Sequence, residues 1–142
     1  MRQRVVIDTN VLVGAVLIRS GGDNREVLRA CLKGLVQPVL GMALFSEYED
    51  LFLRSALMVK SPLSEKERIV LLESFLSVCE WVKVYYLWRP NLPDEADNHL
   101  IELALAGGAY TIVTNNLRDV SRGELTFPSL NIFTPSQFLK TF

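Results

Sequence analysis

Cysteine is scarce in this sequence, since Cys31 and Cys79 are the only two among 142 residues. Both lie in apolar, periodic stretches. We therefore expect reduced thiols inside the fold and disfavour a disulfide or a sulfur-based metal centre. Histidine is scarcer still, with His99 alone. A lone His at the opening of an expected helix is more typical of a structural or exposed side chain than of a catalytic one, so we leave it outside the candidate site.

Long hydrophobic runs and an excess of one charge are also absent. No apolar run reaches the ~18 residues that a membrane-spanning helix needs. Residues 1–4 lead into an expected strand rather than into the apolar region of a signal peptide, which predicts a cytoplasmic protein. The net charge of -1 and the pI of about 5.8 give no global basic field. Any contact with nucleic acid must therefore depend on a local patch.

The composition that is present is that of an ordinary globular protein. Hydrophobic residues make up 49% and charged residues 22% of the chain, which excludes the signature of disorder. The length is enough for one domain with a substantial core, so residues 1–142 are predicted to form a single domain.

Strands and helices are expected to alternate along the chain. The β-branched residues at 4–7 predict a strand that is buried on both faces, as in parallel sheets. Pro38 suggests that the next strand, at 36–40, lies at an edge or begins there. Ser46 and Ser64 are each followed three positions later by Glu, which predicts the starts of two helices. The remaining expected elements are helices at 11–18, 25–33, 97–106 and from Pro135, a loop at 20–24, and strands at 81–87, 111–114 and 130–133. This order predicts an α/β fold with a parallel sheet.

Acidic residues stand at the ends of several of these elements. Asp8 ends the first strand, Glu47 lies in FSEYEDL, and Asp97 opens the helix DNHLIELAL. Taken singly, each is also interpretable as a helix cap, a turn residue or a solvated acid. The carboxyl ends of the strands in a doubly wound sheet meet at one edge, however. Three carboxylates gathered there would repel one another, and Mg²⁺ or Mn²⁺ would relieve that repulsion. Phosphodiester hydrolysis is the chemistry expected of such a site.

Four segments carry a family resemblance over nearly the whole chain: VVIDTNVLVGAVL, FSEYEDLF, LPDEADNHLIELALAGGAYTIVTNNLRDV and IFTPSQFL. In this order they resemble the PIN-domain family of metal-dependent nucleases, and within it the bacterial and archaeal toxin components of toxin-antitoxin pairs. The resemblance implies an α/β/α sandwich with a central parallel sheet of about five strands. It also implies that Asp8, Glu47 and Asp97 are metal ligands, with Asp94 at a position where this branch tends to carry a further acid.

The same resemblance implies RNA as the substrate in preference to DNA, an antitoxin as a protein partner, and a homodimer. The apolar helices expected between residues 51 and 79 hold more hydrophobic surface than one sheet face needs, which fits a dimer.

The segment VTNNLRDV departs from the family pattern. Many members carry an acid two residues after the Thr that ends this strand, and here that position is Asn116. An amide can hold a water or a metal-bound oxygen but has no charge. Asp119 either replaces part of that charge or is a surface or helix-cap acid. We expect one tightly held metal and reduced activity.

Polar and basic residues complete the predicted site. Thr9, Asn10 and Thr114 are predicted to order the site beside the substrate, although Asn10 can equally close a turn. The arginines in loops or at helix starts are either phosphate contacts or solvated surface residues: Arg19, Arg25, Arg89, Arg118 and Arg122.

Two functions of different classes follow from these observations. The first is a Mg²⁺- or Mn²⁺-dependent ribonuclease, an endonuclease that acts as the toxin of a type II toxin-antitoxin pair. The alternative is a catalytically weak or inactive PIN-like module that binds RNA or a protein, which Asn116 favours. A receiver-like domain also gathers acids around magnesium, but its phosphoacceptor context is missing.

Overall fold

A parallel sheet of five strands forms the centre of the fold, in the order β3-β2-β1-β4-β5. The computed structural model describes residues 2–17, 22–54, 56–84, 98–116 and 130–142. The strands are β1 (Gln3–Ile7), β2 (Val36–Leu40), β3 (Glu80–Trp81), β4 (Thr111–Val113) and β5 (Asn131–Phe133). The helices are α1 (Thr9–Leu17), α2 (Gly22–Leu32), α3 (Met42–Glu49), the π-helix η1 (Asp50–Arg54), the 3-10 helix η2 (Ala56–Lys60), α4 (Glu65–Val78), α5 (Asn98–Gly107) and α7 (Pro135–Leu139).

The strand order changes direction beside β1. From β1 the chain adds β2 and β3 on one side, and it later returns to add β4 and β5 on the other. Val5 of β1 pairs with Pro38 in β2 and with Thr111 in β4. The backbone N–H of Asp8 continues the second pairing and donates to the carbonyl of Val113 at 2.9 Å. The carboxyl ends of β1 and β4 therefore lie side by side, at the position where α/β folds place their binding sites.

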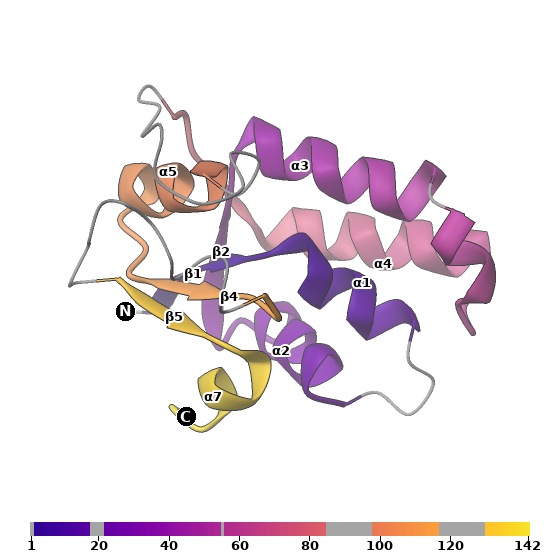
Figure 1. The fold of residues 1–142 in the computed structure, drawn as a ribbon, viewed down its shortest axis with the longest axis horizontal. Helices are drawn as coiled ribbons and strands as arrows, with labels where there is room; N and C mark the ends of the chain where they lie inside the picture. Colours follow the sequence, from indigo (N-terminus) through magenta and orange to yellow (C-terminus); the bar gives the residue numbers. More distant parts are fainter. Residues whose placement is uncertain (1, 18–21, 55, 85–97, 117–129) are drawn as a thin grey trace.

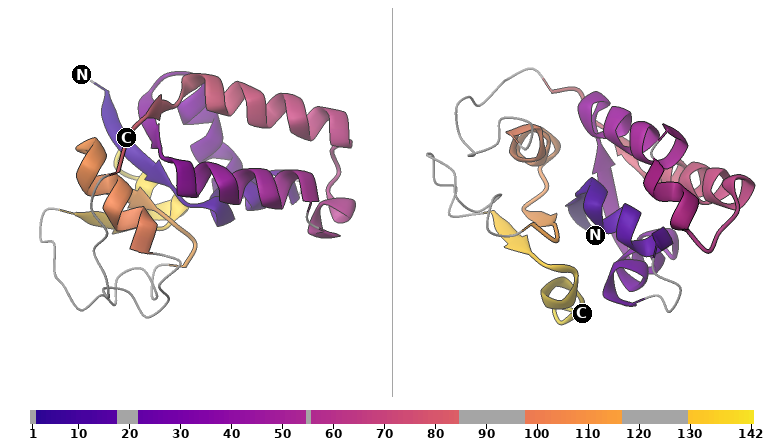
Figure 2. Two further views of the ribbon diagram at one scale, coloured as in Figure 1. Left: turned by 90° about the horizontal axis from the view of Figure 1, so that it is seen from above. Right: turned by 45° about the vertical axis from the view of Figure 1, so that its right-hand side comes forward.

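Helices cover both faces of the sheet (Figure 1). On one face α5 contacts β1, β2 and β4, and on the other α2 contacts β2 and α7. The helices α3 and α4 run side by side in both views of Figure 2, and the rings of Tyr48 and Phe75 join them with 5.8 Å between centroids. This arrangement confirms the predicted α/β/α sandwich. None of the described helices is long and apolar enough to cross a membrane.

The core explains why the first predicted strand and helix form where they do. Val5, Val6 and Ile7 are buried in β1, which has helices on both sides. The following helix is apolar on nearly every side because it too is enclosed, with Val11 and Leu12 among its buried residues. Burying such a side chain contributes about 1.5–3 kcal/mol relative to leaving it exposed. The junction that carries Asp8 is therefore held by core packing before and after it.

Two predicted helix starts are confirmed by their caps. The hydroxyl of Ser64 accepts a hydrogen bond from the backbone N–H of Glu67 at 3.1 Å, and the Glu67 carboxylate accepts one from the backbone N–H of Ser64 at 2.9 Å. Pro135 opens α7 after the N-cap Thr134. Both cysteines are free thiols, as expected, and burial raises the pKa of Cys31 to about 12.

The predicted start of α3 at Ser46 is wrong by about one turn. The helix begins at Met42, and its N-cap is Gly41, which makes no side-chain cap hydrogen bond. Leu44 and Tyr48 lie one turn apart in this helix and are both buried. Tertiary packing of an apolar face contributes more to a short helix than one capping group, so the buried pair decides where α3 begins.

The position of Pro38 in the sheet and two element boundaries also differ from the predictions. Pro38 lies in the inner strand β2, but β3 pairs only with Val39 and Leu40, so the missing N–H of Pro38 falls outside the ladder with β3. Within the described part of the segment expected as a strand at 81–87, β3 ends at Trp81. The helix α2 begins at Gly22, inside the expected loop.

Candidate active site

Asp8 is a buried carboxylate at the end of β1, and it is held by neutral donors. Only 6% of its surface is exposed. Its Oδ1 accepts a hydrogen bond from the backbone N–H of Thr9 at 2.7 Å, and its Oδ2 accepts one from the Thr114 hydroxyl at 2.7 Å. The amide of Asn10 donates to Oδ2 at a longer 3.3 Å. Burial raises the pKa of Asp8 more than these hydrogen bonds lower it, and the charge of Glu47 adds to the increase.

Glu47 lies on α3 and is joined to Asp8 through a single residue. The Thr9 hydroxyl donates to Glu47 Oε1 at 2.5 Å across 38 positions of the sequence. The backbone N–H of the same threonine donates to Asp8. Thr9 therefore binds both acids at once, with its main chain on one side and its side chain on the other.

A buried tyrosine sets the position of Glu47 relative to β1. The phenol of Tyr48, the residue next to Glu47, donates to the carbonyl of Ile7 at 2.5 Å. Ile7 directly precedes Asp8 in the chain. This hydrogen bond fixes α3 against the end of β1, so that Glu47 reaches the first turn of α1.

The segment after β4 is tied to the segment after β1. Thr114 is buried and donates to Asp8, and its Oγ1 in turn accepts from the backbone N–H of Asn116 at 3.0 Å. The backbone N–H of Asn115 donates to the side-chain oxygen of Asn10 at 3.0 Å. The main chain at Asn116 is therefore one hydrogen-bonded step from the carboxylate of Asp8.

His99 also lies at this candidate site, although our sequence analysis left it outside. Its Nε2 lies 2.7 Å from Glu47 Oε2, with the histidine at the start of α5. Burial raises the pKa of Glu47, but the hydrogen bonds from His99 and Thr9 outweigh burial and leave that pKa lowered. The available sequence signal was its place two residues after Asp97, at the same expected edge of the sheet.

The structure brings most of the predicted residues that it describes to one edge of the sheet. These are Asp8, Thr9, Asn10, Glu47, Thr114 and Asn116. Arg25 instead donates to the carbonyl of Ala15 at 2.9 Å. Other predicted site residues lie outside the described residues, namely Asp94, Asp97, Arg118, Asp119, Arg19, Arg89 and Arg122.

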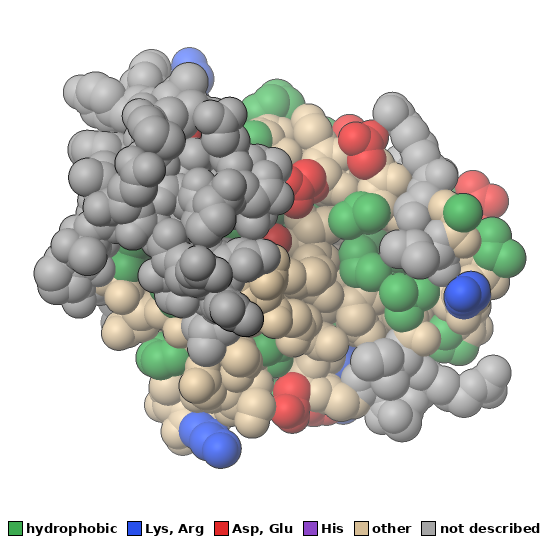
Figure 3. Space-filling view, viewed as in Figure 1, with side chains coloured by type: hydrophobic (Ala, Val, Ile, Leu, Met, Phe, Trp, Pro, Cys, Tyr) green, Lys and Arg blue, Asp and Glu red, His purple; other side chains and the backbone are tan. Residues whose placement is uncertain are grey.

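The donor set suits a hard cation, although it is incomplete in the described residues. Asp8 and Glu47 supply carboxylate oxygens, the ligand type that Mg²⁺ and Mn²⁺ prefer. Within the five described ranges, no three His, Cys, Asp or Glu side chains form a group suited to a metal. No Lys or Arg of those ranges forms an ion pair with Asp8 either. Figure 3 shows acidic side chains near the middle of one face and also toward its edges, where Lys and Arg side chains lie.

Comparison with known proteins identifies the family. A family model described as the PIN domain matches residues 4–118. The chain belongs to the PIN-domain family. PIN domains are generally nucleases and typically use divalent metal ions. No curated protein matches this PIN domain.

A solved structure supports the same fold. VapBC2 from Rickettsia felis, bound to a DNA fragment from its promoter, resembles the chain with a TM-score of 0.61 and 17% sequence identity. The match covers 93% of this chain and 98% of the other. The predicted family and its α/β/α architecture are therefore confirmed.

Proposed function

We propose that this PIN domain is a ribonuclease that hydrolyses phosphodiester bonds inside an RNA chain with the help of Mg²⁺ or Mn²⁺. The observation that carries the proposal is the link between Asp8 and Glu47 through Thr9, with hydrogen bonds of 2.7 and 2.5 Å, beside the point where the strand order switches. A buried carboxylate without an ionic partner among the described residues is costly, and a bound cation relieves that cost.

The proposed roles follow from the donor types. Asp8 and Glu47 hold the cation together with Asp97, and Asp94 and Asn116 add oxygen ligands or hold its waters. Thr9, Asn10 and Thr114 orient the carboxylates beside the substrate, and Arg118 contacts a phosphate. When bound, a divalent cation lowers the pKa of a water ligand and offsets the charge that develops on the phosphate.

A cleavage assay tests the proposal directly. We expect labelled single-stranded RNA to be cut in Mn²⁺ or Mg²⁺, to stay intact in EDTA, and to yield 5'-phosphate ends. Asp8→Asn should lower the rate at least about 100-fold, the scale on which loss of a transition-state electrostatic contact acts. Asp23→Asn, which changes an exposed acid on α2, is the matched control and should cut normally. Equal residual cleavage by wild type and Asp8→Asn would reveal a contaminating nuclease and contradict the proposal.

We further propose that the chain is the toxin of a type II toxin-antitoxin pair, located in the cytoplasm and forming a homodimer. The resemblance of the sequence to toxin components and the likeness in fold to VapBC2 support this. Expression of the chain alone should arrest bacterial growth, and Asp8→Asn should not. Co-expression with a small antitoxin encoded beside it should restore growth and give a complex that purifies together. Normal growth with active wild-type protein present would count against a toxin.

Asn116 keeps a second function open. An amide where many relatives carry an acid leaves the site one charge short, as expected of a weak or inactive module that binds RNA or a protein. RNA binding in EDTA without cleavage in any divalent metal would favour this function.

A further inference from the structure

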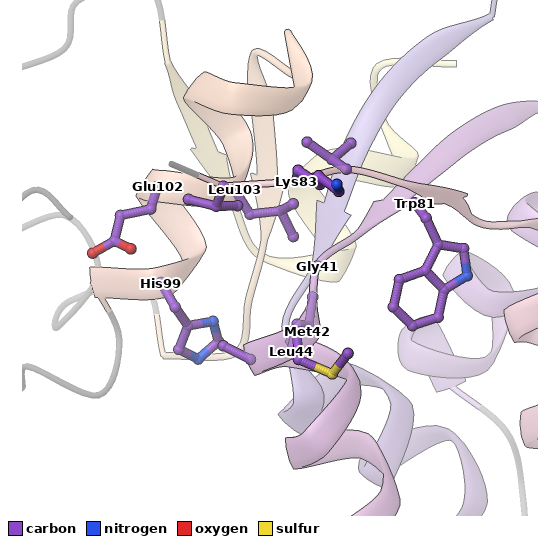
Figure 4. A pocket seen from close by; sticks show the side chains of 11 residues that line it. Gly41, Met42, Leu44, Trp81, Lys83, His99, Glu102 and Leu103 are labelled. Carbon is purple, nitrogen blue, oxygen red and sulfur yellow. The ribbon is translucent and has the colours of Figure 1, made fainter. Parts of the chain in front are cut away.

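A cavity of about 710 Å³ opens next to the acidic site. Its walls come from the start of α3, the chain at 81–84 and α5, and they are mostly apolar. In Figure 4, Trp81 stands on one side and His99 and Glu102 on the other, with Gly41 and Met42 between them. The cavity volume falls in the range of pockets that enclose small organic ligands.

His99 connects this cavity to Glu47. Its Nε2 contacts the Glu47 carboxylate at 2.7 Å, while the residue also lines the cavity. Its other ring nitrogen, Nδ1, is buried, and no hydrogen-bond partner for it exists among the described residues. Because Nε2 is engaged with Glu47, Nδ1 is the ring nitrogen left for a further hydrogen bond. A buried ring nitrogen without a partner is unfavourable, and a ligand with a hydrogen-bonding group would satisfy it.

Trp81 gives the cavity an aromatic wall. The residue is 52% exposed, and its ring packs against Phe45 with 5.3 Å between centroids, so the indole is held on one side while Trp81 stays partly accessible. Lys83, two residues further on, is exposed and adds a positive charge to the lining. An aromatic face, an unpartnered ring nitrogen and a cation beside an apolar floor suit a nucleotide, whose base stacks and hydrogen-bonds while its phosphate contacts the cation.

We propose that this cavity binds a nucleobase of single-stranded RNA, with the phosphate that follows it directed toward Glu47. The inference rests on the proposed ribonuclease function and adds a subsite to it. His99 both lines the cavity and contacts Glu47, so a base in the cavity is adjacent to the acids. Binding of that base places one particular phosphate at the cleavage centre.

Binding without cleavage tests the subsite. Fluorescence anisotropy in EDTA measures the Kd for a short labelled single-stranded RNA of randomised sequence, and free nucleoside monophosphates serve as competitors. Trp81→Leu should weaken binding about tenfold, the effect expected from the loss of one base-aromatic stack. Trp81→Phe keeps an aromatic face and should retain most of the affinity. Tyr110→Leu removes an aromatic side chain that is 61% exposed and does not line the cavity, and it should bind as wild type.

Filling the cavity gives a second test that leaves Trp81 in place. Ala43 is exposed on α3 and lines the cavity, so Ala43→Leu should occupy part of it and weaken RNA binding several-fold. Ala106→Leu makes the same change at an exposed site on α5 that does not line the cavity, and it should have no effect. Circular dichroism and the melting temperature establish that each variant folds.

The outcomes separate this inference from the proposed function. Weaker binding by Trp81→Leu and Ala43→Leu, in a protein that cleaves nothing in any metal, would support the subsite and reject the ribonuclease. Normal cleavage with unchanged KM in both variants would keep the ribonuclease and overturn the subsite. The subsite also fails if wild type binds no RNA in EDTA, or if the two variants lose affinity only for a protein partner.

Discussion

At the scale of single residues, Thr9 hydrogen-bonds to both acids of the site, and Asp8 is the acid whose charge is unfavourable to bury. The threonine hydroxyl faces Glu47 and its main chain faces Asp8, so the two carboxylates are held close although their charges repel. The neutral donors around Asp8 reduce the cost of burying its charge but do not cancel it, which is why its pKa stays raised. A site of this kind is poised to gain stability from a cation.

The substitution Asp8→Asn tests this gain. At pH 7 without metal, the variant should be at least as stable as wild type, because a buried charge has been removed while the shape of the side chain is kept. Millimolar Mn²⁺ should raise the melting temperature of wild type by several degrees and leave that of Asp8→Asn unchanged. Differential scanning fluorimetry in EDTA and in Mn²⁺ measures both. A similar rise in the two proteins would place the metal elsewhere.

The raised pKa also predicts the direction of a pH effect. A carboxyl whose pKa is higher in the folded state binds its proton more tightly there than in the unfolded chain, so its contribution to stability falls as pH rises. For Asp8 this loss begins near the ordinary value of 3.8 and ends above the raised one. The pKa of Glu47 is lowered, so the contribution of Glu47 to stability is lost as pH falls. The difference between wild type and Asp8→Asn in urea unfolding at several pH values isolates the first effect, and a difference that does not vary with pH would contradict it.

Asn116 gives the third prediction at this scale. Its backbone N–H donates to Thr114, which in turn donates to Asp8. Asn116→Asp therefore adds a charge near the site without a change in the backbone. We expect tighter Mn²⁺ binding and faster RNA cleavage, by about tenfold, which equals about 1.4 kcal/mol. Isothermal titration and initial rates measure these changes. Unchanged metal affinity would mean that position 116 is not part of the metal site.

At the scale of helices and strands, the correct predictions were those of elements that a pattern of neighbouring residues marks in the sequence. The β-branched run of β1 and the capping box at Ser64 are patterns of neighbouring residues, and both were predicted correctly, although β1 is also held by its pairing with β2 and β4. The start of α3 was not, because Leu44 and Tyr48 gain their burial from distant parts of the chain.

The same distinction applies to the candidate site. Asp8 was predicted from its place at the end of the first expected strand, and Glu47 from the family resemblance; in the structure both carboxylates accept hydrogen bonds from Thr9. The contact of His99 with Glu47 spans 52 positions and depends on how α5 lies against α3. No spacing within either helix encodes that contact, so it emerged only from the tertiary fold.

The hydrogen bond from Tyr48 to Ile7 predicts a separation of stability from activity. Tyr48→Phe removes the donor and should lower the free energy of unfolding by about 1 kcal/mol. Ser64→Ala removes the cap of α4, far from the acids in sequence, and should cost about the same. Only Tyr48→Phe should also reduce kcat for RNA, because α3 then loses its anchor beside Asp8 and Glu47 moves. Urea unfolding and cleavage rates compare the pair, and equal kcat values would show that Glu47 is positioned without Tyr48.

At the scale of the whole molecule, the site and the proposed dimer surface use different parts of the fold. The acids gather where strand order switches beside β1, whereas the segment from η1 to α4 carries exposed apolar residues. Val59 is 85% exposed and Val70 is 54% exposed. Apolar side chains left in water on packed helices are a common feature of surfaces that bury them against a partner.

These two valines support the last prediction. If the chain is a homodimer that pairs through this segment, Val59→Glu and Val70→Glu place a charge in an apolar, self-complementary interface and should raise the dimer dissociation constant at least about tenfold. Leu35→Glu introduces the same charge at a residue that is 59% exposed outside this segment, and it should leave the dimer intact. Sedimentation equilibrium measures all three against wild type. Because Asp8 and Glu47 lie on other elements, the monomeric variants should keep their Mn²⁺-induced rise in melting temperature, so that a lost dimer is distinguished from a lost fold. A wild-type protein that is monomeric at every concentration, or a Leu35→Glu variant that dissociates equally, would contradict pairing through this surface.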